Sequence, residues 1–300
     1  MIDYSDYERS FFCYDGLSCN KVGLVQNGVY YMVKFPGNLH HLAKVDLDHA
    51  NDMISEYIAS RVVSLYMMAH VVDLGWYHGK QCVACKDFVG DSGRLIEYTK
   101  LKTTLSEPII DKNGNVSNGL SPEIDDVDYV LNHNRTAQQV KGVHESFWRM
   151  FILDALNGNT DRNNGNWGLL LKNGTISFAP VYDNGNALNS KWSDEKMETS
   201  IQNAEDMRTI AFKGCVCFFK HDDRKINPFQ YIEANGAPYI KNELSKLDFS
   251  EVMYQKVCDI VEDTETISDV RKCFYKELYR LRFEELRRIQ VAQNEFIAHA

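Results

Sequence analysis

The chain is short of positive charge and of long apolar runs. Its 300 residues include 33 Lys and Arg against 42 Asp and Glu, for a net charge of −9, so binding along a nucleic-acid backbone is not expected. No apolar run approaches the roughly 18 residues that a membrane-spanning helix needs. The first residues also lack the basic start and apolar core of a signal peptide. We therefore predict a cytoplasmic protein without nucleic-acid or membrane partners, with signal-independent export as the alternative.

Paired cysteines and several ligand motifs are also scarce. Of eight cysteines, only Cys82 and Cys85 have the CxxC spacing of metal and redox sites. Because both lie in an apolar run and no second pair follows at finger spacing, we interpret them as buried strand thiols. The glycine-rich GxGxxG, Walker and HExxH patterns are absent as well, which excludes the commonest nucleotide-loop and zinc-protease signatures.

Two Asn-Gly dipeptides each separate a pair of strand-like runs. The first, Asn27-Gly28, lies within residues 21–35, and the second, Asn173-Gly174, lies within residues 167–180. Type I′ turns need positive φ at both central residues, which Asn and Gly tolerate. Each dipeptide therefore predicts a tight β-hairpin.

Helical spacing of apolar residues is clear in two segments. It predicts a helix over residues 48–70, with Asp48 as N-cap, and a closing amphipathic helix over residues 270–296. The apolar face of the first helix consists of Ile54, Ile58, Val62, Leu65 and Met68.

Composition suits a large domain or two lobes, since 44% of the residues are apolar and 25% are charged. We expect residues 1–90 to form a small sheet with one helix, and residues 91–300 to be mainly helical. Residues 103–128 are polar and turn-rich, which predicts a long exposed loop. The polar segment 185–207 is expected to be flexible.

Three polar residues follow the layout of a phosphoryl-transfer site. Asn166 follows Asp161 by five residues, and Asp183 comes after the second predicted hairpin. In this layout the first Asp accepts or orients the acceptor hydroxyl. An amide oxygen and a carboxylate are suitable ligands for Mg²⁺, which would be held against the phosphates of ATP.

Upstream residues complete this layout. Lys34 ends a predicted strand and Glu56 lies 22 residues later in the predicted helix, so the two side chains can meet and fix the lysine against the α and β phosphates. The alternative is a solvated lysine and a surface glutamate. The segment 15–21, with Gly16 and Ser18, can cover phosphates because small residues let backbone N–H groups approach anionic oxygens; the alternative is a surface turn.

Together these motifs resemble the HipA-like Ser/Thr protein kinase family, and within it the short CtkA-type members that lack an extra amino-terminal domain. The resemblance extends over roughly residues 12–190. It is carried by residues 16–21, 33–36, 159–166 and 180–185.

The resemblance implies an α+β, bilobal, protein-kinase-like fold related to the phosphoinositide kinases. A small sheet-plus-helix N-lobe would precede a mainly helical C-lobe, with ATP and Mg²⁺ between them. The implied activity is phosphorylation of Ser or Thr on a protein substrate, regulated by autophosphorylation of Ser18 in the phosphate loop. The family also raises an antitoxin as a partner.

Residue roles follow from the same resemblance. Asp161 would be the catalytic base, and Asn163 stands where many relatives have a histidine. The remaining implied ligand residues are Lys34 for phosphates, Lys86, Asp87 and Phe88 as the adenine hinge, and Asn166 and Asp183 for magnesium.

Two rival functions stay open at this point. A pseudokinase would bind nucleotide as a regulatory module, and the asparagine at 163 together with the irregular glycine loop leaves room for it. A phosphoinositide or small-molecule kinase would use the same layout, and Arg162 is shared with lipid kinases. Because the chain has no obvious basic stripe facing a membrane, a protein acceptor is favoured.

Overall fold

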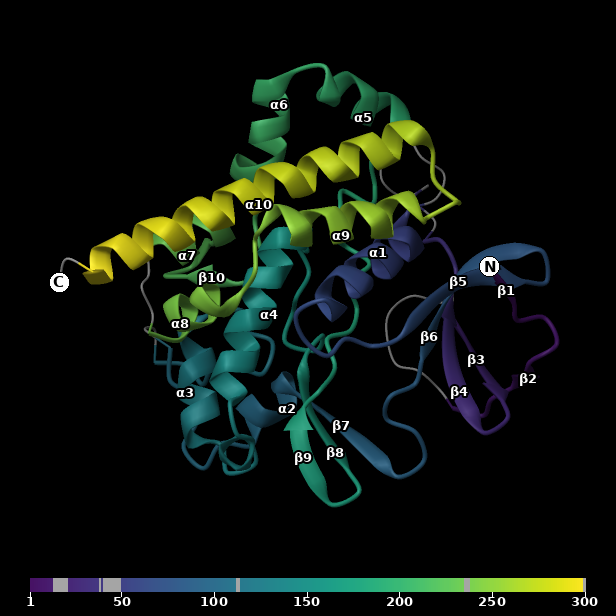
Figure 1. The fold of residues 1–300 in the computed structure, drawn as a ribbon. Helices are drawn as coiled ribbons and strands as arrows, with labels where there is room; N and C mark the ends of the chain where they lie inside the picture. Colours follow the sequence, from purple (N-terminus) through teal and green to yellow (C-terminus); the bar gives the residue numbers. More distant parts are fainter. Residues whose placement is uncertain (13–20, 38, 40–49, 112–113, 235–237, 299–300) are drawn as a thin grey trace. The chain divides into compact units, whose positions relative to one another are not determined.

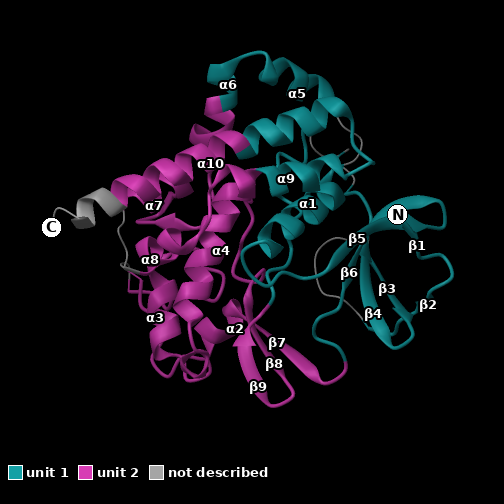
Figure 2. Cartoon of the chain, viewed as in Figure 1, with its two compact units in different colours: residues 1–90, 180–207, 255–279 teal, residues 91–179, 208–254, 280–300 magenta. Residues whose placement is uncertain are grey.

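The structure is a computed structural model that describes residues 1–12, 21–37, 39, 50–111, 114–234 and 238–298. Its residues divide into two compact units, coloured separately in Figure 2. Unit 1 consists of residues 1–90, 180–207 and 255–279, and unit 2 consists of residues 91–179, 208–254 and 280–300.

Unit 1 contains a six-stranded sheet with strand order β1-β5-β6-β4-β3-β2 (Figure 1). The pairing of β1 with β5 is parallel and the other pairings are antiparallel. Asn27 and Gly28 have φ angles of 50° and 74°, which confirms the first predicted hairpin. The strands are β1 (Ile2–Asp3), β2 (Glu8–Arg9), β3 (Lys21–Gln26), β4 (Val29–Lys34), β5 (Val72–Tyr77) and β6 (Lys80–Lys86).

Helix α1 (Asp52–Ser64) packs against β5 and β6, with Ile54, Ile58 and Val62 fully buried. It is shorter than predicted at both ends. Asn51, rather than Asp48, occupies the N-cap position, and Asp48 itself lies outside the described residues. After the helix, Ala69 forms a parallel bridge with Val181, and Met68, predicted to lie on the apolar face, is exposed instead.

The segment 185–207, predicted to be flexible and polar, contains regular structure. Helix α5 (Asp194–Ile201) starts at Ser193, whose side chain accepts a hydrogen bond from the Lys196 backbone N–H. The buried Arg271 guanidinium donates to Asp194 at 2.6 Å and to the Trp192 carbonyl at 2.8 Å. Where the sequence predicted a flexible loop, the structure therefore has a helix whose start is bound by Arg271. Three further helices have residues in both units: α6 (Ala204–Arg208), α9 (Glu251–Glu262) and α10 (Asp269–Ala298). The last confirms the predicted closing helix.

Unit 2 combines a three-stranded antiparallel sheet with helices. The sheet has the order β7-β8-β9, from β7 (Gly93–Glu97), β8 (Gly168–Lys172) and β9 (Thr175–Phe178). Asn173 and Gly174 have φ angles of 51° and 74°, confirming the second hairpin. The other elements are α2 (Tyr98–Thr103), α3 (Asp125–His133), η1 (Ala137–Gln139), α4 (Val143–Asn157), η2 (Thr209–Lys213), β10 (Lys220–His221), β11 (Arg224–Lys225), α7 (Pro228–Ala234) and α8 (Pro238–Lys246).

The core of unit 2 surrounds helix α4, which is buried on almost every side. Phe147 and Trp148 of this helix are at most 1% exposed, and the Phe147 ring lies 4.6 Å from that of Trp167. Trp167 in turn stacks on Tyr98 at 4.4 Å. This aromatic packing fixes the residues that directly precede β8. Among the described residues, no helix is both long and apolar enough to cross a bilayer.

Gly168 provides a test of this packing. A Cβ at Gly168 would lie 2.2 Å from the Ile96 carbonyl oxygen of the neighbouring strand, so Gly168→Ala must push the two strands apart. We expect the thermal midpoint to fall by about 4 °C or more. The matched control is Gly214→Ala, where φ is −82° and the nearest atom is 3.5 Å away. Equal midpoints for the two variants would contradict this account.

Candidate active site

Lys34, at the end of β4, lies between two carboxylates within unit 1. Its Nζ is 2.8 Å from Glu56 Oε2 and 2.9 Å from Asp183 Oδ1. Burial disfavours the Lys34 charge, but the two carboxylates outweigh it and raise the pKa of Lys34 well above its usual range. Burial likewise disfavours the Glu56 charge, yet Lys34 and His70 lower the pKa of Glu56 far below its usual value. The structure thus brings these three sequence-predicted residues together as ions.

Sequence reasoning missed the residues that bind the other oxygen of Glu56. The Asn184 backbone N–H donates to Glu56 Oε1 at 2.8 Å, and His70 Nε2 lies 3.0 Å from the same oxygen. The Asn184 side chain donates to Ser60 Oγ at 2.8 Å. Asn184 could have been suspected as the neighbour of Asp183, and Ser60 as lying one helical turn after Glu56. His70 carries no local signal, because only the fold brings it to the helix.

The Asp183 carboxylate is held on an unusual backbone. Its φ is 58°, a left-handed conformation that aspartate tolerates better than most residues. Two residues earlier, Val181 forms a parallel bridge with Ala69, which fixes the approach of the chain. The side chain remains 44% exposed while it contacts Lys34. An exposed anionic oxygen next to a lysine suits a metal ion that neutralises phosphate charge.

The predicted hinge residues follow β6 directly. The Asp87 backbone N–H donates to the Tyr30 carbonyl at 2.9 Å, and its carboxylate accepts a hydrogen bond from the Val89 N–H at 2.7 Å. The Phe88 ring lies 5.7 Å from that of Tyr182, next to Asp183. Lys86 is the last residue of the strand. Gly16 and Ser18, the predicted phosphate-loop residues, lie outside the described residues.

In unit 2, a buried ion pair organises the loop that carries Asp161. Arg162 is 1% exposed and binds the Asp154 carboxylate of α4 through both Nε, at 2.8 Å, and Nη2, at 3.0 Å. Its Nη1 donates to the Asn166 carbonyl at 2.8 Å. The Asn159 side chain donates to Asp154 and accepts a hydrogen bond from the Asp161 N–H, both at 3.1 Å. The loop is therefore anchored at both ends to one buried carboxylate.

Two asparagine side chains complete the loop. Asn166 Nδ2 donates to the Asp161 carbonyl at 2.9 Å, so its amide oxygen faces the other way. Asn163 Oδ1 accepts a hydrogen bond from the Gly165 N–H at 2.9 Å, and its Nδ2 lies 3.4 Å from Asp161 Oδ1. The Asp161 carboxylate thus has a neutral side chain as its neighbour, at the position where the sequence resemblance led us to expect a histidine.

The donor chemistry fits magnesium rather than a metal held entirely by protein. No cluster of three or more His, Cys, Asp or Glu that could hold a metal occurs in the described part of the chain. Mg²⁺ usually takes one or two protein oxygens together with water and substrate phosphates. The Asp183 carboxylate of unit 1 and the Asn166 amide oxygen of unit 2 each have oxygen-donor chemistry that suits Mg²⁺.

The two CxxC cysteines are buried in β6, which confirms their interpretation as strand thiols. Burial raises the pKa of Cys82 to about 12, and burial together with nearby carboxylates raises that of Cys85. Both side chains therefore stay as thiols at neutral pH, and neither has the thiolate character of a metal or redox site.

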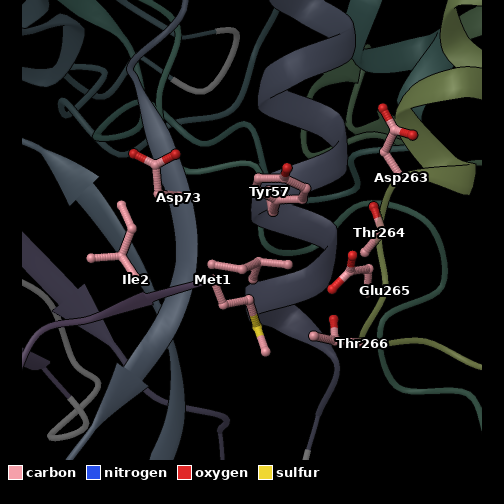
Figure 3. A pocket seen from close by; sticks show the side chains of 9 residues that line it. Met1, Ile2, Tyr57, Asp73, Asp263, Thr264, Glu265 and Thr266 are labelled. Carbon is pink, nitrogen blue, oxygen red and sulfur yellow. The ribbon is translucent and has the colours of Figure 1, made fainter.

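A separate hollow of about 250 Å³ in unit 1 is shown in Figure 3. Tyr57 from α1 and Asp73 from β5 face it, together with Asp263 and Glu265 from the connection after α9. The residues that line it include no Lys or Arg. They also include none of the residues that the sequence predicted to bind substrate. Its acidic lining disfavours a triphosphate.

Comparison with known proteins shows that the chain resembles a protein kinase. The chain is 29% identical to the serine/threonine-protein kinase CtkA of Helicobacter pylori strain J99 over 265 residues, or 87% of this chain and 78% of that protein. The crystal structure of the H. pylori proinflammatory kinase CtkA superposes with a TM-score of 0.86 at 26% identity, covering 98% of each chain. The predictions of an α+β kinase-like fold and of a kinase are confirmed by these matches.

A second solved structure supports the wider resemblance. HipA from the Shewanella oneidensis MR-1 complex of HipA, HipB and operator DNA matches with a TM-score of 0.52 at 11% identity, over 94% of this chain and 65% of that one. At this identity the likeness concerns the fold alone. The predicted resemblance to HipA-like kinases, and to the CtkA-type members among them, is confirmed. No family model matches the chain.

The buried ion pair of unit 2 gives a direct stability test. Arg162→Met leaves the Asp154 carboxylate buried without its cation, which we expect to cost about 3–5 kcal/mol in unfolding free energy. The matched control is Arg288→Met, which removes an ion pair whose arginine is 51% exposed and should cost at most about 1 kcal/mol. Urea unfolding measures both variants; similar losses in the two would show that Asp154 does not depend on Arg162.

Proposed function

We propose that the chain is a Mg²⁺-ATP-dependent protein kinase that phosphorylates Ser or Thr. The observation that carries the proposal is Lys34, an ammonium held between the buried Glu56 and the half-exposed Asp183. Phosphoryl transfer needs few covalent steps from the protein, and depends on placing cations against the phosphates. A lysine fixed by two carboxylates is suited to that task.

Lys34 is proposed to contact the α and β phosphates, with Glu56 holding its ammonium in place. The hinge at Lys86, Asp87 and Phe88 would receive adenine through backbone groups, because the Asp87 carboxylate is already bound to the turn that follows. Bound magnesium would neutralise phosphate charge. Asp183 is its proposed anionic ligand.

Asp161 is proposed to accept or orient the proton of the acceptor hydroxyl, and Asn166 to supply the second protein ligand for magnesium. The hydrogen bond from the Asn166 side chain to the Asp161 carbonyl supports both roles, because it ties Asn166 to the backbone of the residue that carries the proposed base. Anchoring of this loop by Arg162 limits the motion of both groups. Such preorganisation favours transfer.

A protein is the proposed acceptor, in keeping with the name of the CtkA relative. A phosphoinositide or small molecule is the competing acceptor class. An antitoxin partner stays a prediction from the family resemblance, since the match to HipA supports the fold alone.

The kinase proposal is tested by incubating the protein with radiolabelled Mg²⁺-ATP and a panel of protein, inositol-lipid and sugar acceptors. Asp161→Asn keeps the side-chain shape but removes the base, so we expect phosphate incorporation to fall by about 100-fold or more. Asp206→Asn, at an exposed position of α6, should transfer like wild type.

Other outcomes of this assay identify the rivals. Nucleotide-induced thermal stabilisation without phosphate transfer to any acceptor would identify a pseudokinase. Incorporation only into lipid or sugar would overturn the protein-kinase assignment. Loss of stabilisation in Lys34→Met, compared with wild type, would support the phosphate contact independently of turnover.

Autophosphorylation of Ser18 is the proposed regulation. Protein incubated with Mg²⁺-ATP should lose activity as phosphate accumulates at Ser18, because a phosphate of about −2 charge repels nucleotide phosphates. Phosphopeptide mapping and activity are measured in parallel. Ser18→Ala should keep its activity over time, whereas Ser245→Ala, on the exposed surface of α8, should decline like wild type. Phosphate at another site with unchanged activity would refute this regulation.

A further inference from the structure

Glu56 is a buried anion with more than one essential partner. It is 1% exposed, and Lys34 occupies only one of its two oxygens. The other, Oε1, is 2.8 Å from the Asn184 backbone nitrogen and 3.0 Å from His70 Nε2. Because buried carboxylates are costly unless their oxygens accept hydrogen bonds, these contacts decide where the carboxylate rests.

The geometry determines which ring nitrogen of His70 carries a proton. An unprotonated Nε2 would direct its lone pair at the Glu56 carboxylate across 3.0 Å, which is repulsive. The proton must therefore be on Nε2, where it is donated toward Glu56. Ser60 Oγ lies 2.9 Å from the same nitrogen and accepts a hydrogen bond from the Asn184 side chain. All four residues are buried and linked in one network.

The backbone of His70 is fixed as well. Its N–H donates to the Val181 carbonyl at 2.9 Å, and the Val181 N–H donates to the Met68 carbonyl at the same distance. Val181 lies two residues before Asp183 in the chain. His70 therefore touches, through its backbone and its ring, both segments that supply the carboxylates around Lys34.

We infer that His70 is a positioning residue that orients Glu56 toward Lys34 and couples that pair to the segment carrying Asp183. The inference deepens the proposed function and rests on the phosphate-binding role assigned there to Lys34. His70 itself is 5% exposed and contacts Glu56 and Ser60. It acts through these residues rather than on the substrate.

A pair of amide variants separates this role from simple packing. In His70→Gln the side-chain amide can place its N–H near the position of Nε2, whereas in His70→Asn the shorter amide falls near Nδ1 and cannot reach Glu56. Glutamine and asparagine are both polar and uncharged, so the two variants differ mainly in how far the side-chain amide extends from the backbone. His133→Gln, at an exposed histidine of α3, is the control for a histidine replacement elsewhere.

The first readout needs no turnover. In nucleotide-free protein, the acylation rate of Lys34 by a small amine-reactive reagent is measured by peptide mass spectrometry at pH 8.5, relative to the exposed Lys80. Because the Lys34 Nζ is held by Glu56 at 2.8 Å and by Asp183 at 2.9 Å, it should react slowly. His70→Asn should raise the Lys34 rate about three- to tenfold, and His70→Gln should stay within about twofold of wild type.

The second readout is the kinetics of phosphate transfer. His70→Asn should lower kcat, by a factor about tenfold larger than the factor by which it changes KM for ATP. His70→Gln should keep kcat close to that of wild type. Equal Lys34 acylation in wild type and in folded His70→Asn would overturn the inference, as would equal behaviour of the Asn and Gln variants. If wild type transfers no phosphate but the acylation difference holds, the proposed function fails and the positioning role stands.

Discussion

The interaction on which the rest of the candidate site depends is the ion pair between Lys34 and the buried Glu56. Removing one member of such a pair costs about 3–5 kcal/mol because the other charge stays buried alone. The surrounding structure therefore converges on one carboxylate: a lysine at the end of β4, the connection that follows α1, and the chain beside Asp183. The sheet, the helix and the segment that carries Asp183 all contribute partners to this anion.

Unit 2 also contains a buried ion pair, but its cation is fully buried, whereas the cation of the pair in unit 1 is partly exposed. There the buried cation is Arg162, and Asp154 of α4 is its anion. The pair does not itself face a substrate; it fixes the loop in which Asp161 and Asn166 lie. In unit 1 the buried ion holds a lysine that is 16% exposed and can meet a ligand. Both units thus use a buried charge to hold a neighbouring group that is available for chemistry.

Much of the local structure could be predicted from the sequence. The two Asn-Gly hairpins are encoded by residues that adopt positive φ, and the apolar spacing of α1 and α10 reflects one buried face. Helix boundaries were less accurate. Helix α1 begins at Asp52, whose carboxylate accepts a hydrogen bond from the Gly37 N–H, and a pattern of apolar residues does not register such a contact.

The sequence predicted the pairing of Lys34 with Glu56, but the other partners of the buried charges could not be predicted. Glu56 and His70 are separated by a helix end and a turn, and the link from Asn184 to Glu56 crosses 128 positions in the chain. No periodicity encodes such contacts. The helix within segment 185–207 was missed for the same reason, because Asp194 and the Trp192 carbonyl at its start are bound by Arg271, far along the sequence. Composition shows that a segment is polar, but only the folded structure shows whether its polar groups form hydrogen bonds.

The asparagine at position 163 has a consequence for the charge beside Asp161. A histidine there would change charge between about pH 5 and 8 and would alter the field at Asp161. The Asn163 amide stays neutral over this range, and its orientation is set by the Gly165 N–H. Arg162, the neighbouring cation, is largely offset by Asp154. The side chain 3.4 Å from Asp161 Oδ1 therefore keeps the same charge across this pH range, which a histidine at this position would not do.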